Sequence, residues 1–459
     1  MKKTFSELAY KDEDKFVFGS SLYPVKCGFE VEIGNGLVIP EVNYTLPTME
    51  ISEQTFTKVM DEFHTMVDEI LKRCIILQAP AVVLEFEHVY DLTVNPVWGQ
   101  SITEDTKKLM HRYYESDGLK SALRVTVADI RGKNHPPLMR HGNELAQMLD
   151  SFQLCAKSGA DIVSVESTGG KEVADKCIVE CDIKGILFSV GVLGSLDMEF
   201  LWDKIVEISK RNNVVPGGDT DCAHSNTAMR LAYMKYIPYT FAALVRAIGA
   251  ARSLVAFERG AIGPNKDCGY EGPILKAITG MPISMEGKSS ACAHATHMGN
   301  VASAVCDLWS NESVQHTRLL GGFAPEIFSE ILLYDCRLMN QAIEDNYALM
   351  LRDLMVASDI KTSPEALVIA PSSAIKIAQA IVNHKSYYRR ALEAALIAQE
   401  IIRNAVKEGK LILPDREIKW LDKFTKKLEE CPDDENEFVE QMCKKYQGLF
   451  IPEEYGLKT

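Results

Sequence analysis

Short, apolar, valine-rich runs recur along this chain, separated by stretches with helical spacing. AVVLEFE at 81–87 has the length and composition of a strand that is buried on both faces of a parallel sheet. Stretches such as GNELAQMLDSFQLCAKSG instead place apolar residues three and four apart, as an amphipathic helix does. Alternation of this kind predicts parallel βαβ units. Eight runs are predicted to be strands: 81–87, 122–129, 161–167, 185–193, 213–219, 253–260, 282–287 and 366–372.

Eight strands favour an α/β protein built as a closed (β/α)₈ barrel (TIM barrel), with a doubly wound open sheet as the alternative. Residues 1–50 are expected to form an irregular extension packed on the barrel, because prolines interrupt their periodicity. The catalytic barrel is expected to span 51–372, with a helical insertion near 288–365. Residues 373–459 are rich in strong helix formers and are expected to form a C-terminal helical segment.

Composition narrows the class of protein. The 459 residues are 46% hydrophobic and 25% charged, which excludes a largely disordered or collagen-like chain. The net charge of −14 is opposite to that of a non-specific nucleic-acid binder. No uninterrupted apolar run approaches the ~18 residues of a membrane span, and charged residues return early at the N-terminus, unlike in a signal peptide. We therefore expect a cytoplasmic protein with no nucleic-acid or membrane partner, whose twelve scattered cysteines are reduced.

Acidic and thiol side chains follow several predicted strands, which is where a barrel carries its active site. Taken singly, such a carboxylate more often caps a helix or joins an ion pair, and a lone cysteine is more often a small core residue. Glu166, Cys222 and Cys268 would come from three different strand ends. Two thiolates and a carboxylate are suitable zinc ligands, and three protein ligands leave a fourth position open, as in catalytic zinc sites. Because ligands that are far apart in sequence have no spacing signature, composition alone leaves this a hypothesis.

Other residues could form a competing metal site. Cys292, His294 and His297 place three potential ligands within six residues, but the alanines between them favour a closely packed helix start. His224, two residues after Cys222, could replace the carboxylate ligand, and we rank it lower.

Several segments carry a family resemblance. NPVWGQSI, GGDTDCAHSNTAM and the long block at 217–330 resemble the methanol–corrinoid protein methyltransferases, the substrate-activating subunits of methanol-using methanogens and acetogens. The likeness runs from about residue 15 to 450. It implies a (β/α)₈ barrel with added helical segments and one catalytic zinc held by a glutamate and two cysteines. The glutamate of VES corresponds to Glu166, the cysteine of GGDTDC to Cys222, and the cysteine of GPNKDC to Cys268.

The resemblance also implies a reaction and a partner. A separate corrinoid-carrying protein would supply the cobalamin, and this chain would form the homodimer core of a heterotetramer. The chain has no D-x-H-x-x-G corrinoid signature of its own, which agrees with that division. Zinc would bind the methanol oxygen as a Lewis acid while reduced cobalt attacks the methyl carbon. A carboxylate could relay the proton, and Glu85, Glu87 and Asp129 are candidates from strand-end placement alone.

Two alternative functions remain open from sequence. The chain could be another zinc-dependent barrel enzyme, either a methyltransferase for a different small donor or a hydrolase or lyase. It could also be a non-catalytic scaffold subunit that docks a corrinoid protein.

Overall fold

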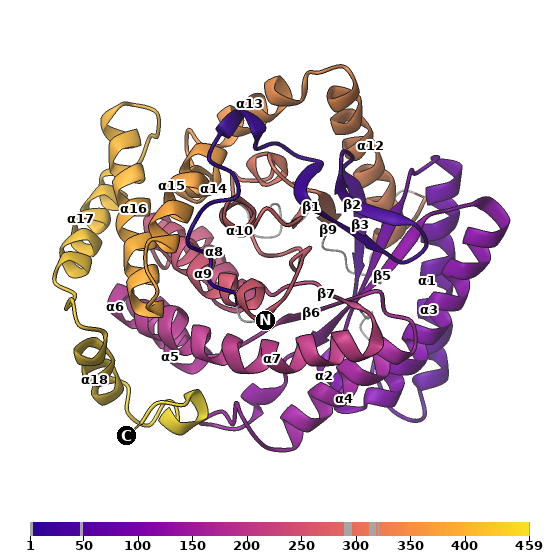
Figure 1. The fold of residues 1–459 in the computed structure, drawn as a ribbon, viewed down its shortest axis with the longest axis horizontal. Coiled ribbons are helices and arrows are strands. Elements are labelled where there is room, and N and C mark those ends of the chain that lie inside the picture. The colour runs from indigo at the N-terminus through magenta and orange to yellow at the C-terminus, as the bar shows by residue number, and fades with distance from the viewer. Residues whose placement is uncertain (1–2, 46–48, 289–295, 312–317, 320, 459) are drawn as a thin grey trace.

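A curled parallel sheet forms the centre of the molecule and is surrounded by helices (Figure 1). The computed structural model describes residues 3–45, 49–288, 296–311, 318–319 and 321–458. The sheet has seven strands in the order β7-β6-β5-β4-β3-β9-β8, so the predicted α/β fold class is confirmed. The strands are β3 (Ile39–Tyr44), β4 (Val82–Glu87), β5 (Ser121–Ala128), β6 (Ile162–Glu166), β7 (Val215–Pro216), β8 (Ser284–Glu286) and β9 (Leu308–Asn311).

An extended segment, 262–267, lies between the two edges of this sheet. On one side the amides of Ile262 and Gly263 donate to the carbonyls of β7 and of Gly217, at 2.9 and 2.8 Å. On the other side the carbonyl of Asp267 accepts a 3.0 Å hydrogen bond from the amide of Glu286 in β8. The segment, here called the closing segment, therefore bridges β7 and β8, the two edge strands of the seven-stranded sheet.

Helices cover the outside of the sheet, and their bounds follow the βα alternation through the first part of the chain. Those of the barrel are α1 (Phe56–Ile76), α2 (Tyr90–Val94), α3 (Pro96–Asp117), α4 (Asn143–Lys157), α5 (Lys171–Glu180), α6 (Ile183–Ile186), the π-helix η3 (Leu187–Gly194), α7 (Ser195–Asn212), the π-helix η4 (Cys222–Asn226), α8 (Thr227–Tyr233), α9 (Tyr239–Arg259), α10 (Gly272–Thr279), α12 (Ala324–Glu344) and α13 (Ala348–Asp359). Short 3₁₀ turns are η1 (Glu13–Lys15), η2 (Arg131–Lys133), η5 (Val301–Ser303) and η6 (Pro452–Tyr455).

Three runs predicted to be strands are helical instead. Residues 185–193 lie in α6 and η3, and residues 253–259 lie in α9, which ends just before Gly260. Residues 366–372 span the end of α14 (Pro364–Ile369), Ala370 and the start of α15 (Pro371–Val382). All three helical stretches are almost completely buried. A helix that is apolar on every side has no amphipathic periodicity, so a short apolar run from it cannot be told from a buried strand.

The N-terminal segment, expected to be irregular, contains three strands. β1 (Ser20–Cys27) and β2 (Val31–Asn35) form an antiparallel hairpin, and β3 joins the central sheet between β4 and β9. Pro40 is the second residue of β3, where a proline removes only one amide donor near the start of the strand. The interval 288–365, expected to be a helical insertion, likewise supplies β9 and, outside the sheet, the small hairpin β10 (Arg318–Leu319) and β11 (Gly322–Phe323).

The C-terminal segment is helical, as expected, and packs on one side of the barrel (Figure 1). Its helices are α15 (Pro371–Val382), α16 (Tyr387–Lys407), α17 (Asp415–Glu429) and α18 (Glu435–Lys445). Arg390 of α16 forms two 2.9 Å hydrogen bonds with the carboxylate of Glu258 in α9. This buried pair attaches the C-terminal helices to the barrel. The division into three domains stays a prediction.

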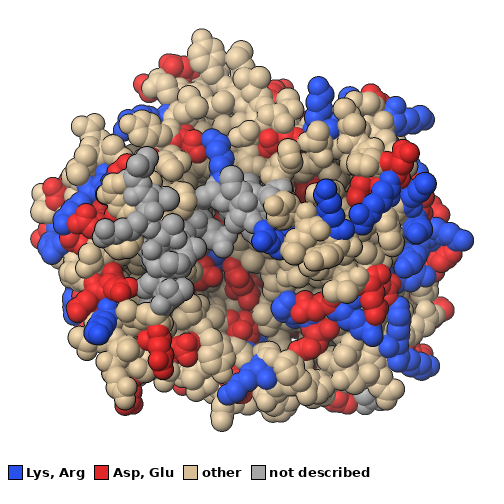
Figure 2. Space-filling view, turned by 180° about the vertical axis from the view of Figure 1, so that it is seen from behind, with Lys and Arg blue, Asp and Glu red and all other residues tan. Residues whose placement is uncertain are grey.

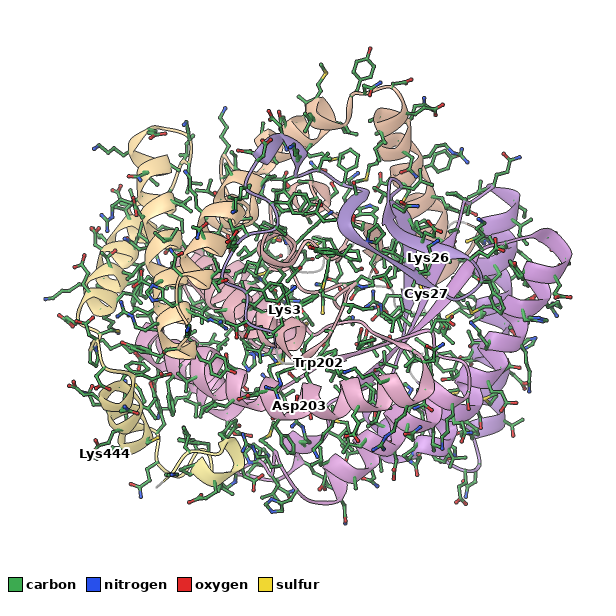
Figure 3. The ribbon with its side chains drawn as sticks, in the orientation of Figure 1. Lys3, Lys26, Cys27, Trp202, Asp203 and Lys444 are labelled. Carbon is green, nitrogen blue, oxygen red and sulfur yellow. The ribbon has the colours of Figure 1, made fainter. Side chains whose placement is uncertain are left out.

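Two helical stretches have the length and hydropathy of membrane spans. They are Ile183–Asn212 and Tyr239–Arg259, and 83% and 100% of their most apolar windows are buried inside the protein. Figure 3 labels Trp202, a residue of α7 within the first stretch. Its indole is fully buried and donates a 2.9 Å hydrogen bond to Asp219. These stretches are core helices of the folded chain.

Candidate metal centre

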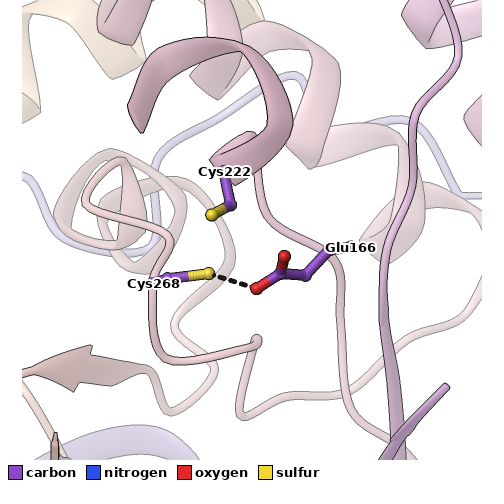
Figure 4. A group of neighbouring side chains, drawn as sticks. All are labelled: Glu166, Cys222 and Cys268. Atoms are coloured by element: carbon purple, nitrogen blue, oxygen red, sulfur yellow. Dashed lines mark hydrogen bonds between the residues drawn. The ribbon is translucent and has the colours of Figure 1, made fainter. Parts of the chain in front are cut away.

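Glu166, Cys222 and Cys268 converge on one point at the carboxyl end of the sheet (Figure 4). Their ligand atoms, one carboxylate oxygen and two sulfurs, all lie within 4.8 Å of one another. The thiol of Cys268 donates to Glu166 Oε1 at 2.6 Å. The structure therefore brings together the three residues that the sequence placed at separate strand ends.

Each of the three residues is positioned by a different strand of the barrel. Glu166 is the last residue of β6, and Cys222 is the first residue of η4, a few residues after β7. Cys268 directly follows the closing segment 262–267. Because parallel strands all end at the same edge, three neighbouring strand positions deliver the three side chains to one place.

The donor set fits a divalent metal ion. Burial, followed by the neighbouring Cys222 and Glu166, holds the pKa of Cys268 well above its ordinary value. A hydrogen bond from Cys268 lowers the pKa of Cys222, but burial and Glu166 raise it to about 12. Thiols of this kind ionise when a cation supplies the compensating charge. Two sulfurs and one carboxylate oxygen are ligands that zinc accepts, and a three-residue set leaves a coordination position open.

Lys266 lies beside the three residues and faces several carboxylates. Its ammonium is 3.2 Å from Glu166 Oε1, 3.2 Å from Glu87 Oε2 and 2.5 Å from Asp267 Oδ1. It is also 3.5 Å from Glu85 Oε1. Burial alone would raise the pKa of Asp267, but Lys266 offsets this and the pKa is lowered. Lys266 thus balances part of the negative charge and restrains the Glu166 carboxylate.

A second set of contacts holds the Cys222 side chain and the residue before it. The Nδ2 of Asn226 donates to Cys222 Sγ at 3.1 Å and to the carbonyl of Cys268 at 3.4 Å. Arg246 of α9 donates to Asn226 Oδ1 and, at 2.8 Å, to Glu271. Glu271 in turn accepts a 2.7 Å hydrogen bond from the amide of Asp221. Both cysteines are therefore tied to a network of buried polar groups that lies outside the three-residue ligand set.

The three proton-relay candidates have different surroundings. Glu85 is fully buried, and burial and then Asp267 hold its pKa well above the ordinary value. Glu87 faces Lys266 and keeps a quarter of its side-chain surface exposed, 25%. Asp129 forms a buried ion pair with Arg131 at 2.7 Å, which offsets the effect of burial and lowers its pKa. Glu85 and Glu87 lie around Lys266, and Asp129 lies in a separate network.

The residues considered as ligands of a competing metal site lie in other surroundings or outside the described residues. The Nδ1 of His224 lies 2.8 Å from Asp221 Oδ1, and His224 does not share the cluster of Cys222 and Cys268. His297 is exposed, whereas Cys292 and His294 lie outside the described residues. Two further groups of acidic and thiol ligands occur in the described part of the chain, and both include Asp267: one with Cys268 and Glu286, the other with Glu41 and Glu85.

Sequence reasoning missed the charged residues that precede Cys268. Lys266 and Asp267 lie in the segment PNKDC. The signal that could have revealed them is the presence of charged residues at a position where the barrel is otherwise apolar. Asn43 was also missed, because its strand was expected to be irregular. Its Nδ2 donates to Glu87 and to Asp267, both at 3.1 Å.

The site is open to solvent on one side. Glu87 and Glu166 keep 25% and 26% of their side-chain surface exposed. On the face of the molecule opposite to Figure 1, acidic side chains gather in a central hollow (Figure 2). Glu87 and Glu166 therefore face solvent at the edge of the cluster.

Comparison with known proteins identifies the family. The profile of the methanol-cobalamin methyltransferase B subunit family matches residues 2–456. The chain belongs to this family. The resemblance inferred from the sequence is thereby confirmed, and the chain is a methyltransferase.

Relatives in this methyltransferase family match over the full length. A methanol–corrinoid protein co-methyltransferase of Methanosarcina barkeri (strain Fusaro / DSM 804) is 43% identical over 462 residues, covering 99% of each chain. A chain of the crystal structure of the methanol:cobalamin methyltransferase complex MtaBC from Methanosarcina barkeri superposes with a TM-score of 0.95, at 43% identity. That match covers 99% of this chain and 100% of the other.

Proposed function

We propose that this protein transfers the methyl group of methanol to the reduced cobalt of a partner corrinoid protein, with a zinc ion held by Glu166, Cys222 and Cys268. The observation that carries the proposal is the convergence of these three side chains within 4.8 Å at the carboxyl end of the barrel. The full-length match to a family of methanol-cobalamin methyltransferases supports the reaction.

The bound zinc would supply Lewis acidity toward the methanol oxygen, whose C–O bond is otherwise inert. This chain's residues set the conditions for that chemistry. Asn226 restrains Cys222 and Lys266 restrains Glu166, and both Asn226 and Lys266 are buried. A low local dielectric strengthens each of these electrostatic contacts.

Proton movement is assigned to Glu87 rather than to the two other candidates. Glu87 is partly exposed, so it can exchange a proton with solvent, and its carboxylate lies 3.2 Å from the Lys266 ammonium that also contacts Glu166. Glu85 is closed off from solvent, and Asp129 is committed to Arg131. A positioned carboxylate typically contributes about 10²–10⁴-fold to a proton-transfer step.

The assembly is proposed to be a heterotetramer with a homodimer of this chain at its centre. An exposed apolar surface, here called the α12/α13 patch, supports the homodimer. It comprises Ile331, Tyr334, Leu338, Tyr347, Met350 and Leu354, each 48–63% exposed. If each buries roughly 100 Å², the patch contributes about 600 Å² per protomer, against ~800 Å² for a standard interface. The corrinoid protein would approach the open carboxyl edge of the barrel.

Metal content tests the ligand set first. We expect about one zinc per chain in the purified protein, and loss of zinc in both Cys222→Ala and Cys268→Ala. Cys443→Ala changes a half-buried cysteine in α18 and serves as the matched control. Zinc retained in both ligand variants would overturn the assignment.

A methyl-transfer assay with methanol and reduced cobalamin tests the reaction. The wild type should methylate cobalt in a zinc-dependent way, and both cysteine variants should be inactive. A protein that holds zinc without methylating cobalt would point to another zinc enzyme. A protein that binds a corrinoid partner without needing zinc would point to a scaffold subunit. Glu87→Gln should retain zinc and lose about 10²-fold or more in rate.

A further inference from the structure

A cavity of about 280 Å³ lies apart from the three candidate ligands. Its lining includes Tyr233 at the end of α8, Lys235, Tyr239 at the start of α9, Thr296, and Glu365 at the start of α14. α9 follows β7 and leads back to the segment that pairs with β7, so its first residue lies at the carboxyl edge of the barrel. The cavity therefore opens on the rim of the barrel.

Glu365 is the unusual group in this cavity. It is only 2% exposed, and its Oε1 has no hydrogen-bond partner among the residues that the structure describes. Its Oε2 accepts a 3.3 Å hydrogen bond from Ser363, and no ion pair neutralises the carboxylate among the described residues. The hydroxyl of Thr296, also on the cavity wall, is a second buried oxygen for which the described part of the chain supplies no hydrogen-bond partner. Unsatisfied buried polar groups cost about 1–3 kcal/mol each, so such pairs are rare unless a ligand completes them.

The charged groups near Glu365 are engaged with other partners or exposed, so a bound cation could neutralise this carboxylate. Glu417 of α17 is another buried carboxylate, and it accepts hydrogen bonds from the amide and hydroxyl of Thr240. Arg246 of α9 is committed to Glu271 and Asn226. Lys235 and His297 border the cavity but are exposed. Burial, with a contribution from Glu417, raises the pKa of Glu365 to about 7.

We propose that this cavity binds a small primary alkylammonium ion, whose nitrogen donates hydrogen bonds to Glu365 and Thr296 and whose alkyl group packs against Tyr233 and Tyr239. An ammonium group carries three N–H donors and is attracted to aromatic faces. A hard metal cation would need about six oxygen ligands, more than the two unpartnered oxygens supply. The volume lies just below the ~300–1,000 Å³ of ordinary ligand sites, which restricts the ligand to a small molecule. The site is independent of the proposed methyl transfer.

Calorimetric titration with n-propylammonium chloride tests the site, with sodium and potassium chloride as matched ions. The wild type should bind the ammonium ion, and Glu365→Gln, which keeps the shape and removes the charge, should bind it at least tenfold more weakly. Thr296→Val, which also keeps the shape, should weaken binding several-fold. Because only the ionised carboxylate attracts a cation, affinity should rise as the pH increases through about 7, with release of a proton.

Three outcomes would overturn the proposal. The first is absence of binding by the wild type at about 100 mM ligand, well above the range of a specific site. The second is equal affinity in the wild type and Glu365→Gln, with both shown to be folded by circular dichroism. The third is binding of potassium or sodium ions that equals binding of the ammonium ion, which would make the cavity an alkali-metal site.

Discussion

At the scale of single residues, the candidate metal centre depends on a lysine as much as on its ligands. Lys266 is buried and contacts the carboxylates of Glu85, Glu87, Glu166 and Asp267. Such a cation keeps neighbouring carboxylates from repelling one another and fixes the direction in which Glu166 presents its oxygens. Groups that orient a metal ligand typically affect metal affinity by about 10–100-fold.

Replacing this lysine tests that role. Lys266→Met should lower zinc affinity about 10–100-fold, and Lys266→Arg, which keeps the charge, should recover part of the loss. Competition with a chromophoric chelator measures the affinity. Lys276→Met is the matched control, because Lys276 is equally buried and pairs with Asp307 at 2.9 Å, away from the ligands. Equal loss of zinc in both methionine variants would show a general folding defect instead.

Glu365 should make stability depend on pH. Its pKa is about 7 in the folded protein and 4.5 ordinarily, so the folded state binds the proton more tightly. The free energy of unfolding should therefore fall as the pH rises from about 4.5 to about 7, by up to about 3 kcal/mol from this residue. Urea unfolding of the wild type and Glu365→Gln across this range measures the difference. If the free energies of unfolding of the wild type and Glu365→Gln differed by the same amount at pH 5 and at pH 8, the assigned pKa of Glu365 would be wrong.

The site could be assembled from sequence only in part. Glu166, Cys222 and Cys268 were found because acidic and thiol residues after strands are visible in a single sequence, and the family resemblance assigned their role. Lys266 was not singled out, because a lysine in a barrel position is unexpected until its carboxylate neighbours are seen. Those neighbours come from β4, β6 and the closing segment, and no local pattern connects them.

At the scale of elements, helix α9 supports the site from behind. A Cβ at Gly249 would lie about 2.3 Å from Asp221 Oδ2, so only glycine lets α9 approach the loop that begins η4. Asp221 directly precedes Cys222, and its carboxylate accepts a hydrogen bond from the hydroxyl of Ser225. Close packing of α9 therefore determines where Cys222 is presented.

Gly249→Ala should disturb the site without changing a ligand. We expect it to displace Asp221, to destabilise the fold by about 1–3 kcal/mol, and to weaken zinc binding. Thermal unfolding and metal content measure the two effects. Gly132→Ala is the control, because a Cβ there meets nothing within 4 Å. If Gly249→Ala bound zinc as tightly as the wild type, the loop would be positioned by other contacts.

The elements also show where sequence patterns fail. β4, β5 and β6 were predicted correctly because each is a short apolar run with turn signals on both sides. Residues 253–260 were mistaken for a strand because α9 is buried on every side, so its apolar residues have no periodicity. β3 and the closing segment 262–267 were missed because prolines and charged residues interrupt the apolar pattern by which a buried strand is predicted.

At the scale of the whole molecule, apolar surface is concentrated on one side. Seven of the nineteen large exposed hydrophobic residues in the described chain fall between 331 and 354. A depression of about 280 Å³ lined by Leu338, Tyr347, Met350 and Leu354 joins the faces of α12 and α13. Continuous apolar surfaces of this size on soluble proteins usually mark contacts with other chains.

Disrupting the α12/α13 patch should dissociate the homodimer. Leu338→Glu should shift the protein from dimer to monomer in sedimentation velocity at micromolar concentration, because the charge would be buried in the interface. Ile412→Glu changes a residue of similar exposure, 64%, outside the patch and should leave the dimer intact. Zinc content should not change in either variant. A wild type that sediments as a monomer would exclude this interface.

The order of the strands in the sheet also bears on how the chain is made. β3 is synthesised first of the sheet strands, but its neighbour β9 pairs Leu308 with Ile39, about 270 residues later. At about 5–20 residues per second, one edge of β3 waits roughly 13–54 s on the ribosome for its partner. An unpaired strand edge invites association with other chains. Nascent copies of this protein should therefore depend on chaperones, or on slow, well-spaced translation, until β9 has emerged.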